Sequence, residues 1–247
     1  MRIAALIVIA LTLPLSADIT IVPIHAGIVF GSDGSYTSYD TITNLGTEPV
    51  IVRRGEVYPV FLSGPCEGAE GIRLQSRQST GAPVSCLGLF AYTLEHEGPI
   101  RVDSFVRTSR PVTLPEGGFS SDFYDQRIET ARDWLPANRE AIIPAVPLVS
   151  RTNIFITNPN DFVILVDMTV QRRSPREPER TEHHFILPKS TTVFGLTGLN
   201  DPVCVLPTVC ESSYTLTFTA NGRYYASASA IEQFQDARFY GPTVLEE

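Results

Sequence analysis

The sequence predicts an all-β protein that consists of two β-sandwich domains in tandem. Apolar and polar residues alternate with a period of two in many short runs, which Pro, Gly and Asn separate. This pattern is typical of a sandwich or a barrel. A motif also occurs twice, because residues 39–52 and 153–166 each carry Ile-Thr-Asn, then a turn, then a Val-rich run. A repeat at this distance indicates two similar domains.

The first residues, 1–17, are expected to form a signal peptide. Arg2 precedes an apolar run at residues 3–13, and the small Ala17 offers a cleavage position before Asp18. A helix that spans a bilayer needs about 20 apolar residues, so this run is too short for a membrane anchor. We therefore expect a mature chain without a transmembrane segment, which is secreted or lies in the periplasm or cell envelope.

Both halves share an expected order of strands. Each half begins with a Pro-containing strand, continues through the Ile-Thr-Asn hairpin and closes with a second hairpin. The closing hairpin turns at Gly98-Pro99 in the first half and at Asn221-Gly222, a strong hairpin signal, in the second. Outside the motif, the expected strands are residues 21–24, 55–62, 90–94, 100–106, 142–146, 163–171, 182–187 and 217–230.

One segment, from Ser121 to Leu135, favours a helix instead. Its apolar residues at helical spacing are Tyr124, Ile128, Ala131 and Leu135, and Pro136 ends the run. Ser121 is a suitable N-cap, and the acidic residues that follow it are favoured near a helix N-terminus. We expect a short helix between the two domains, which then cover residues 18–138 and 139–247.

The chain has four cysteines, and an even number in an exported protein indicates disulfides. Because two lie in each half, the two-domain interpretation predicts the bridges Cys66–Cys86 and Cys204–Cys210. A zinc site with four thiolates is the alternative. Such a site would have to join both halves, and the close paired spacing of zinc ligands is missing.

The charge pattern argues against a nucleic-acid partner. The net charge is −8, the only lysine is Lys189, and no basic stripe is present. Binding to nucleic acid requires clustered cations that displace counterions.

Two groups of residues are candidates for binding an unknown protein or glycan. Arg172, Arg173 and Arg176 lie in a charged, Pro-containing loop, and Tyr36 and Tyr39 flank a polar turn. The alternative for the arginines is a solvated loop tip, and the alternative for the tyrosines is half-buried packing.

The sequence predicts no catalytic, cofactor-binding or metal-binding residue. A Gly-x-Ser-x-Gly nucleophile motif is missing. His183 and His184 are adjacent in an expected strand, so their side chains point to opposite faces and do not readily share a metal ion. Asn158 and Asp161 are oxygen-bearing loop residues of the kind that bind calcium, but we favour Asx-turn hydrogen bonds for them.

The motif residues resemble those of exported bacterial proteins that are built from tandem immunoglobulin-like sandwiches and have no assigned function. In that group a strand ends in such a motif, a Gly- or Pro-containing turn follows, and a Val-rich strand returns. The matching residues here are Ile42-Thr43-Asn44-Leu45-Gly46 with Val50, and Ile156-Thr157-Asn158-Pro159 with Val163. The resemblance covers most of residues 19–245 in outline. It implies an extracellular β-module without catalytic activity, and it carries over no functional residue.

We therefore expect an exported structural or interaction module that is not an enzyme. One alternative is a periplasmic assembly chaperone, which also has two such domains but uses a basic pair that we do not find here. The other alternative is a secreted hydrolase with a site between the domains.

Overall fold

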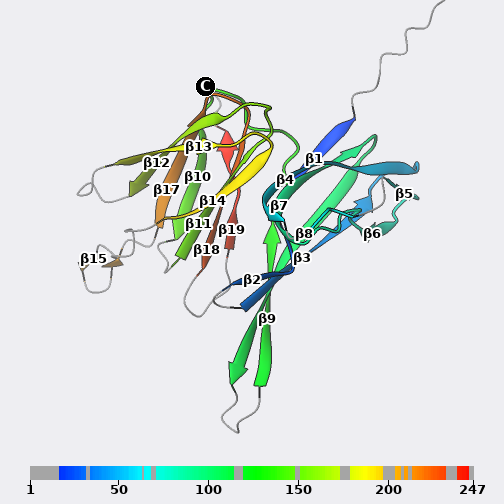
Figure 1. Cartoon of the computed structure of the whole chain (residues 1–247), viewed down its shortest axis with the longest axis horizontal. Coiled ribbons are helices and arrows are strands. Elements are labelled where there is room, and N and C mark those ends of the chain that lie inside the picture. Colours follow the sequence, from blue (N-terminus) through cyan, green and yellow to red (C-terminus); the bar gives the residue numbers. More distant parts are fainter. Residues whose placement is uncertain are drawn as a thin grey trace, which may run out of the picture.

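In the part of the chain that the computed structural model describes, all regular secondary structure is β, with antiparallel sheets and no helix (Figure 1). The described residues are 17–31, 34–62, 64–67, 71–113, 119–147, 151–172, 179–196, 204–206, 209–210, 213–231 and 238–244. Within them no helix has the length and apolar character needed to cross a membrane.

The first half of the chain forms two sheets. Sheet I has the order β1-β7-β4-β5, and sheet II has the order β2-β3-β8-β9 with β6 also paired to β3. Their strands are β1 (Asp18–Gly27), β2 (Val29–Gly31), β3 (Gly34–Asn44), β4 (Val50–Leu62), β5 (Ile72–Leu74), β6 (Ser79–Gly81), β7 (Gly88–His96), β8 (Ile100–Thr113) and β9 (Phe119–Ile128). Buried side chains of both sheets, such as Val52 and Ile42, form one apolar core. This arrangement is consistent with a β-sandwich.

The second half also forms two sheets, and a separate core lies between them. Sheet III has the order β13-β12-β17-β10-β20, and sheet IV has the order β14-β11-β18-β19. Their strands are β10 (Ala141–Pro147), β11 (Arg151–Asn158), β12 (Ile164–Arg172), β13 (Arg180–Ile186), β14 (Ser190–Leu196), β17 (Ser213–Ala220), β18 (Tyr225–Ile231), β19 (Arg238–Tyr240) and β20 (Thr243–Val244). A small ribbon of β15 (Cys204–Leu206) and β16 (Val209–Cys210) stands apart from both sheets.

The two halves repeat one strand order. The order β1-β7-β4-β5 of sheet I recurs as β10-β17-β12-β13, and the order β6-β3-β8-β9 of sheet II recurs as β14-β11-β18-β19. The opening strands even share an irregularity. The register shifts at Pro23 where β1 pairs with β7, and at Pro144 where β10 pairs with β17. A proline lacks the N–H that a regular ladder needs, so a bulge is a favourable place for it.

The repeated Ile-Thr-Asn motif performs the same structural task in both halves. Asn44 and Asn158 are completely buried. Each Oδ1 accepts a 2.8 Å bond from the backbone N–H two residues later, and each amide donates to three backbone carbonyls. These carbonyls belong to Glu48, Leu74 and Gln75 for Asn44, and to Phe162, Ile186 and Leu187 for Asn158. The amide therefore ties the end of one sheet to the edge strand of the other, and Asn158 makes the expected Asx turn.

The predicted hairpins are wrong, because each of these turns leads from one sheet of a half to the other. At Asn221-Gly222, β17 belongs to sheet III and β18 to sheet IV. A Cβ at Gly222 would lie 2.6 Å from Cγ2 of Ile164, and a Cβ at Gly98 would lie 2.7 Å from Cγ2 of Val50. Both glycines are thus needed for close packing at a corner, a role that the sequence pattern does not distinguish from a hairpin turn.

The predicted helix at residues 121–135 is also wrong. Residues 119–128 form β9, which pairs along ten rungs with β8. Its last side chains alternate, since Gln126 and Ile128 are buried while Asp125 and Arg127 are exposed. The acidic residues that suggested a helix N-terminus instead lie opposite arginines of β8, and pairing with a long strand outweighs a weak helical spacing.

A small third cluster joins the two halves. Phe155 of β11 packs against Ile24, Val106 and Ile128 of the first half. The segment between β9 and β10 is bound on both sides, because Ala131 exchanges two backbone bonds with Ile21 and Leu135 exchanges two with Tyr224. The two main cores therefore stay separate while the halves share a packed junction.

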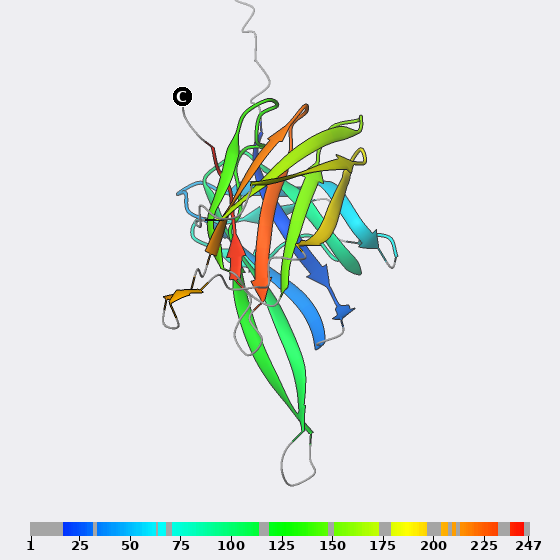
Figure 2. The same ribbon diagram turned by 90° about the vertical axis from the view of Figure 1, so that its left-hand side faces the viewer.

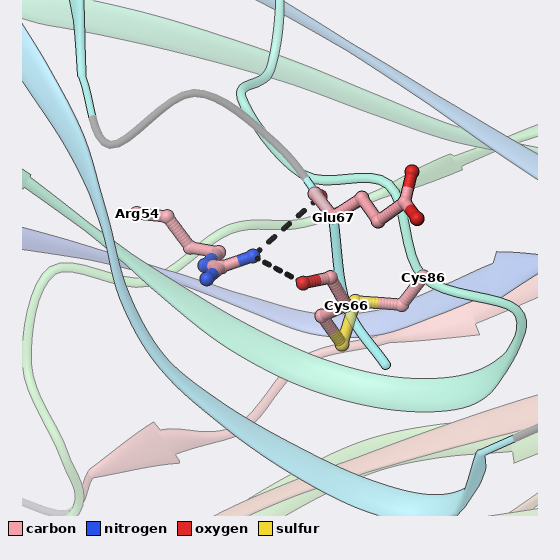
Figure 3. The surroundings of a disulfide bond; sticks show 4 residues. All are labelled: Arg54, Cys66, Glu67 and Cys86. Atoms are coloured by element: carbon pink, nitrogen blue, oxygen red, sulfur yellow. Dashed lines mark hydrogen bonds between the residues drawn. A yellow bond between two sulfur atoms is a disulfide. The ribbon is translucent and has the colours of Figure 1, made fainter. Parts of the chain in front are cut away.

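The Cys66–Cys86 disulfide is present, as predicted. It closes the long connection between β4 and β7, and the Arg54 guanidinium donates to the backbone oxygens of Cys66 (3.3 Å) and Glu67 (3.5 Å) beside it (Figure 3). The backbones of Cys204 and Cys210 are direct partners in the β15–β16 ribbon.

Candidate functional site

Strands β8 and β9 form a long hairpin that extends beyond the rest of the molecule in both views (Figures 1 and 2). Next to the body, β8 lies between β3 and β9, and the last rung with β3 joins Ser35 to Ser109. Beyond that rung the one partner of β8 among the described strands is β9. The outer face of sheet II therefore continues from the body onto the hairpin.

An aromatic and charged cluster occupies this outer face, and we call it the Tyr39 face. It consists of Tyr39, Phe105, Arg107, Phe123 and Asp125. The rings of Tyr39 and Phe105, which are partners in the β3–β8 ladder, stack with centroids 5.4 Å apart. Arg107 lies over the Tyr39 and Phe123 rings, at 5.2 and 5.8 Å from their centroids. Phe123 is 62% exposed, so a large apolar surface faces solvent.

Hydrogen bonds hold this cluster in place. The Arg107 guanidinium donates two 2.7 Å bonds to the Asp125 carboxylate, and the Tyr39 hydroxyl donates a 2.5 Å bond to the same group. The bonds from Arg107 are the main reason why the pKa of Asp125 falls to about 2. Partial burial, and then the bond to Asp125, raise the pKa of Tyr39. The side chains are thus presented in a defined geometry.

The corresponding face of the second half is covered. Aligning the two motif asparagines places Tyr39 at Asn153, and the partner of Asn153 across β11–β18 is Ser229. This outer face of sheet IV packs on the first half through Phe155 and Thr191. The outer face of sheet IV is therefore an interface with the first half, whereas the equivalent outer face of sheet II is open to solvent.

A buried polar quartet lies directly beneath the Tyr39 face. Asp40 accepts hydrogen bonds from His25 Nδ1 (2.7 Å), Tyr92 Oη (2.6 Å) and Ser104 Oγ (2.5 Å). Burial, and then the Asp40 charge, raise the pKa of Tyr92 well above its ordinary value. Ser104 donates to the carboxylate and not to the imidazole, so the quartet does not have the order of a Ser–His–Asp catalytic triad.

The second half has four apolar residues where the first half has the quartet. The residues that correspond to His25, Asp40, Tyr92 and Ser104 are Val146, Ile154, Leu216 and Ala228, by the matching ladder positions of the two halves. All four replacements are fully buried. The fold therefore forms without this network, which makes the quartet a special feature of the half that carries the Tyr39 face.

The predicted candidates occupy different places. Tyr39 is on the exposed face, whereas Tyr36 packs against the junction cluster on the opposite side of sheet II. Arg172 ends β12, while Arg173 and Arg176 lie outside the described residues. The structure does not bring the described candidates together.

The histidines take up local structural roles. His183 pairs with Asp167 (2.6 Å), while His184 approaches Glu182 (3.2 Å) and stacks on Phe194. Within the described residues no group of three or more His, Cys, Asp or Glu side chains is arranged to hold a metal ion.

Sequence reasoning missed Phe105, Arg107, Phe123 and Asp125. Two of them lay in the segment interpreted as a helix. Phe123, Asp125 and Arg127 stand two positions apart in the sequence. In a strand this spacing places their side chains on one face, and it was the signal from which the site could have been found.

In comparisons with known proteins, no protein-family model matches this chain, and no curated protein and no solved structure does either.

Proposed function

We propose that this protein is an exported interaction module without catalytic activity, which binds a protein partner through the Tyr39 face. The observation that carries the proposal is an ordered, exposed set of aromatic and arginine side chains on the outer face of sheet II, at the base of the protruding β8–β9 hairpin. Tyr and Arg are enriched among the residues that dominate protein–protein binding energy. Large exposed apolar surface of this kind marks interaction sites.

A protein partner fits this face better than a glycan. The face is one side of a sheet, and a broad surface of this kind suits another folded surface. The Asp125 carboxylate already accepts three bonds from Arg107 and Tyr39, so little capacity remains for sugar hydroxyls.

Two tandem domains of an immunoglobulin-related sandwich are part of the proposal, and the repeated strand order and the separate cores support them. In an immunoglobulin domain strand B pairs with E and strand C with F. The scheme holds here if β3 and β6 are strands B and E and β4 and β7 are strands C and F. The first strand, β1, lies beside β7, and the last, β8, lies beside β3, so these two strands have exchanged places relative to an immunoglobulin domain. Because Leu135 belongs to the second core, we propose a boundary just after Ile128 in place of 138/139.

Export is supported by the apolar run at residues 3–13, which lies outside the described residues, and by the Cys66–Cys86 bridge. We expect a second bridge between Cys204 and Cys210, because directly paired antiparallel residues lie within disulfide reach. Peptide mapping of the protein purified from the host envelope, without reducing agent, checks this bridge. A free thiol at either position would contradict it.

The binding proposal is tested by capture from the host envelope, followed by affinity measurement with the purified partner. Phe123→Ala removes an exposed ring from the Tyr39 face, and Leu87→Ala removes an exposed side chain elsewhere as a matched control. Loss of a hot-spot residue costs about 2 kcal/mol or more, which corresponds to roughly a 30-fold weaker Kd. Equal binding by both variants and the wild type would rule out the Tyr39 face as the site.

Two other results would also overturn the proposal. Binding of a purified glycan that depends on Phe123 would replace the protein partner by a sugar. Turnover of a hydrolase substrate that is abolished by Ser104→Ala would show that the protein is an enzyme.

A further inference from the structure

Strand β13 is an edge of sheet III, and exposed apolar side chains lie in its last residues and just beyond its end. Among described strands it pairs only with β12, in a regular register from Arg180 to Ile186. Phe185 is 73% exposed and Leu187 is 64% exposed. Val163 is also exposed, immediately before β12. Unpaired edges of this length and character are templates for pairing with another strand.

The first half protects the corresponding edge. There the edge strand is β5, which has only three residues and lies within the connection that the Cys66–Cys86 bridge closes. Its central residue is the exposed Arg73. Very short edge strands and charged side chains are the usual means by which sheets avoid edge-to-edge contacts. The same edge of the sandwich is thus protected in the first half of the chain and open in the second half.

We propose that β13 pairs with β13 of a second copy of this chain, in an antiparallel dimer centred on Phe185. A two-fold axis normal to the sheet leaves each side chain on the same face of the sheet in both copies. Since residues directly opposite each other also share a face, one residue must lie opposite the same residue of the other copy. Centring on Arg180 or Glu182 opposes like charges, which is unfavourable. Centring on Phe185 opposes two exposed rings and places Leu187 opposite His183 of the partner subunit.

The sequence limits this pairing to a short, uncharged segment. Pro188 has no N–H and ends the edge after Leu187. The overlap then covers residues 183–187, and Arg180 and Glu182 lie outside it. The exposed apolar end of β13 is therefore the part that becomes buried, and sheet III continues from one copy into the next.

The mass of the purified mature protein in solution, measured by light scattering over a concentration series, tests the proposal. The wild type is expected to be a dimer, and Phe185→Lys is expected to be a monomer at concentrations where the wild type is dimeric. Thr181→Lys, on the same exposed face but outside the overlap, should remain dimeric. At concentrations low enough for the wild type to be monomeric, both variants should keep its unfolding midpoint, because both sites are exposed in the monomer.

The register has its own test. On mild oxidation Phe185→Cys should form a disulfide between two copies, because residue 185 lies opposite itself across the axis, whereas Thr181→Cys should not. A wild type that stays monomeric throughout the series would overturn the dimer, as would a dimeric Phe185→Lys. Cross-linking at position 181 in preference to 185 would overturn the Phe185-centred pairing.

Discussion

Two asparagines, Asn44 and Asn158, are the clearest examples of single residues on which this architecture depends. Each is fully buried, and its amide donates to three backbone carbonyls around the end of its strand. An aspartate of the same size would bring a carboxylate to these carbonyls, and only an amide supplies the donors. The role is therefore specific to asparagine.

Asn44→Ala and Asn158→Ala should each destabilise the protein by about 3 kcal/mol, because buried carbonyls are left unsatisfied. Urea unfolding followed by circular dichroism measures the change. Leu45→Ala, at an exposed neighbour, should change the free energy of unfolding by less than about 0.5 kcal/mol. A similarly small effect at both asparagines would show that water replaces the amide at no cost.

Asp125 allows a prediction about pH. Its pKa is lowered to about 2 by the bonds from Arg107 and then Tyr39. A lowered carboxyl pKa contributes stability above the unfolded-state pKa, and this contribution disappears as the pH falls through the folded-state value. The Tyr39 face should thus stay intact from neutral pH to about pH 3 and loosen near pH 2.

The carboxyl carbon shift of Asp125, followed by NMR during an acid titration, measures this pKa. In Arg107→Met the midpoint should move up towards the ordinary range of aspartate. A wild-type midpoint already in that range would mean that the Arg107–Asp125 pair is not formed in solution.

At the scale of elements, β9 explains why this site was hard to find in the sequence. Its apolar residues satisfy a helical spacing and an alternating one at the same time, and local pattern does not separate the two. Pairing with β8 decides in favour of the strand, since ten rungs of ladder form along it. Phe123 and Asp125 then lie on the same face as Tyr39, although 84 and 86 positions separate them in the chain.

The buried quartet beneath that face gives a prediction at the same scale. Asp40→Ile alone should destabilise the protein by about 3–5 kcal/mol, because three buried donors lose their acceptor. Replacing His25, Asp40, Tyr92 and Ser104 together by the Val, Ile, Leu and Ala of the second half should restore stability to near that of the wild type.

Thermal and urea unfolding of both variants test this expectation. The fourfold variant is the informative one, because the second half shows that the apolar set packs in this architecture. If the fourfold variant were as unstable as Asp40→Ile, the network would be required by the fold and not a special feature of the first half.

At the scale of the whole molecule, the junction couples the two halves. Lys189 donates 2.8 Å bonds to both carboxylate oxygens of Glu56, and Thr191 donates to the backbone oxygen of Tyr58. Burial raises the pKa of Glu56, but the bonds from Lys189 and Tyr58 outweigh it and the net pKa is lowered. Apolar packing by Phe155 lies alongside these polar contacts.

Calorimetry should therefore show one unfolding transition for the wild type and two for Phe155→Asp, because a charge in the junction cluster separates the halves. Phe155→Ala should cost about 3 kcal/mol. Lys189→Met should cost less than about 1 kcal/mol, because the ion pair that it removes is exposed. Two transitions in the wild type would mean that the junction does not couple the halves.

The sequence by itself determined the all-β class, the repeat of Ile-Thr-Asn and the Cys66–Cys86 bridge, because alternation, turn residues and cysteine position are local signals. Only the tertiary structure decided which strand joins which sheet. Turns that look like hairpins cross between sheets, and the expected helix is a strand. The Tyr39 face and the β13 edge depend on these non-local pairings, since they bring together residues from separate strands or leave a strand unpaired. Partners distant in the chain leave no local pattern, which is the physical reason why the sequence offered Tyr39 as a candidate but not the residues gathered around it, nor the open edge at β13.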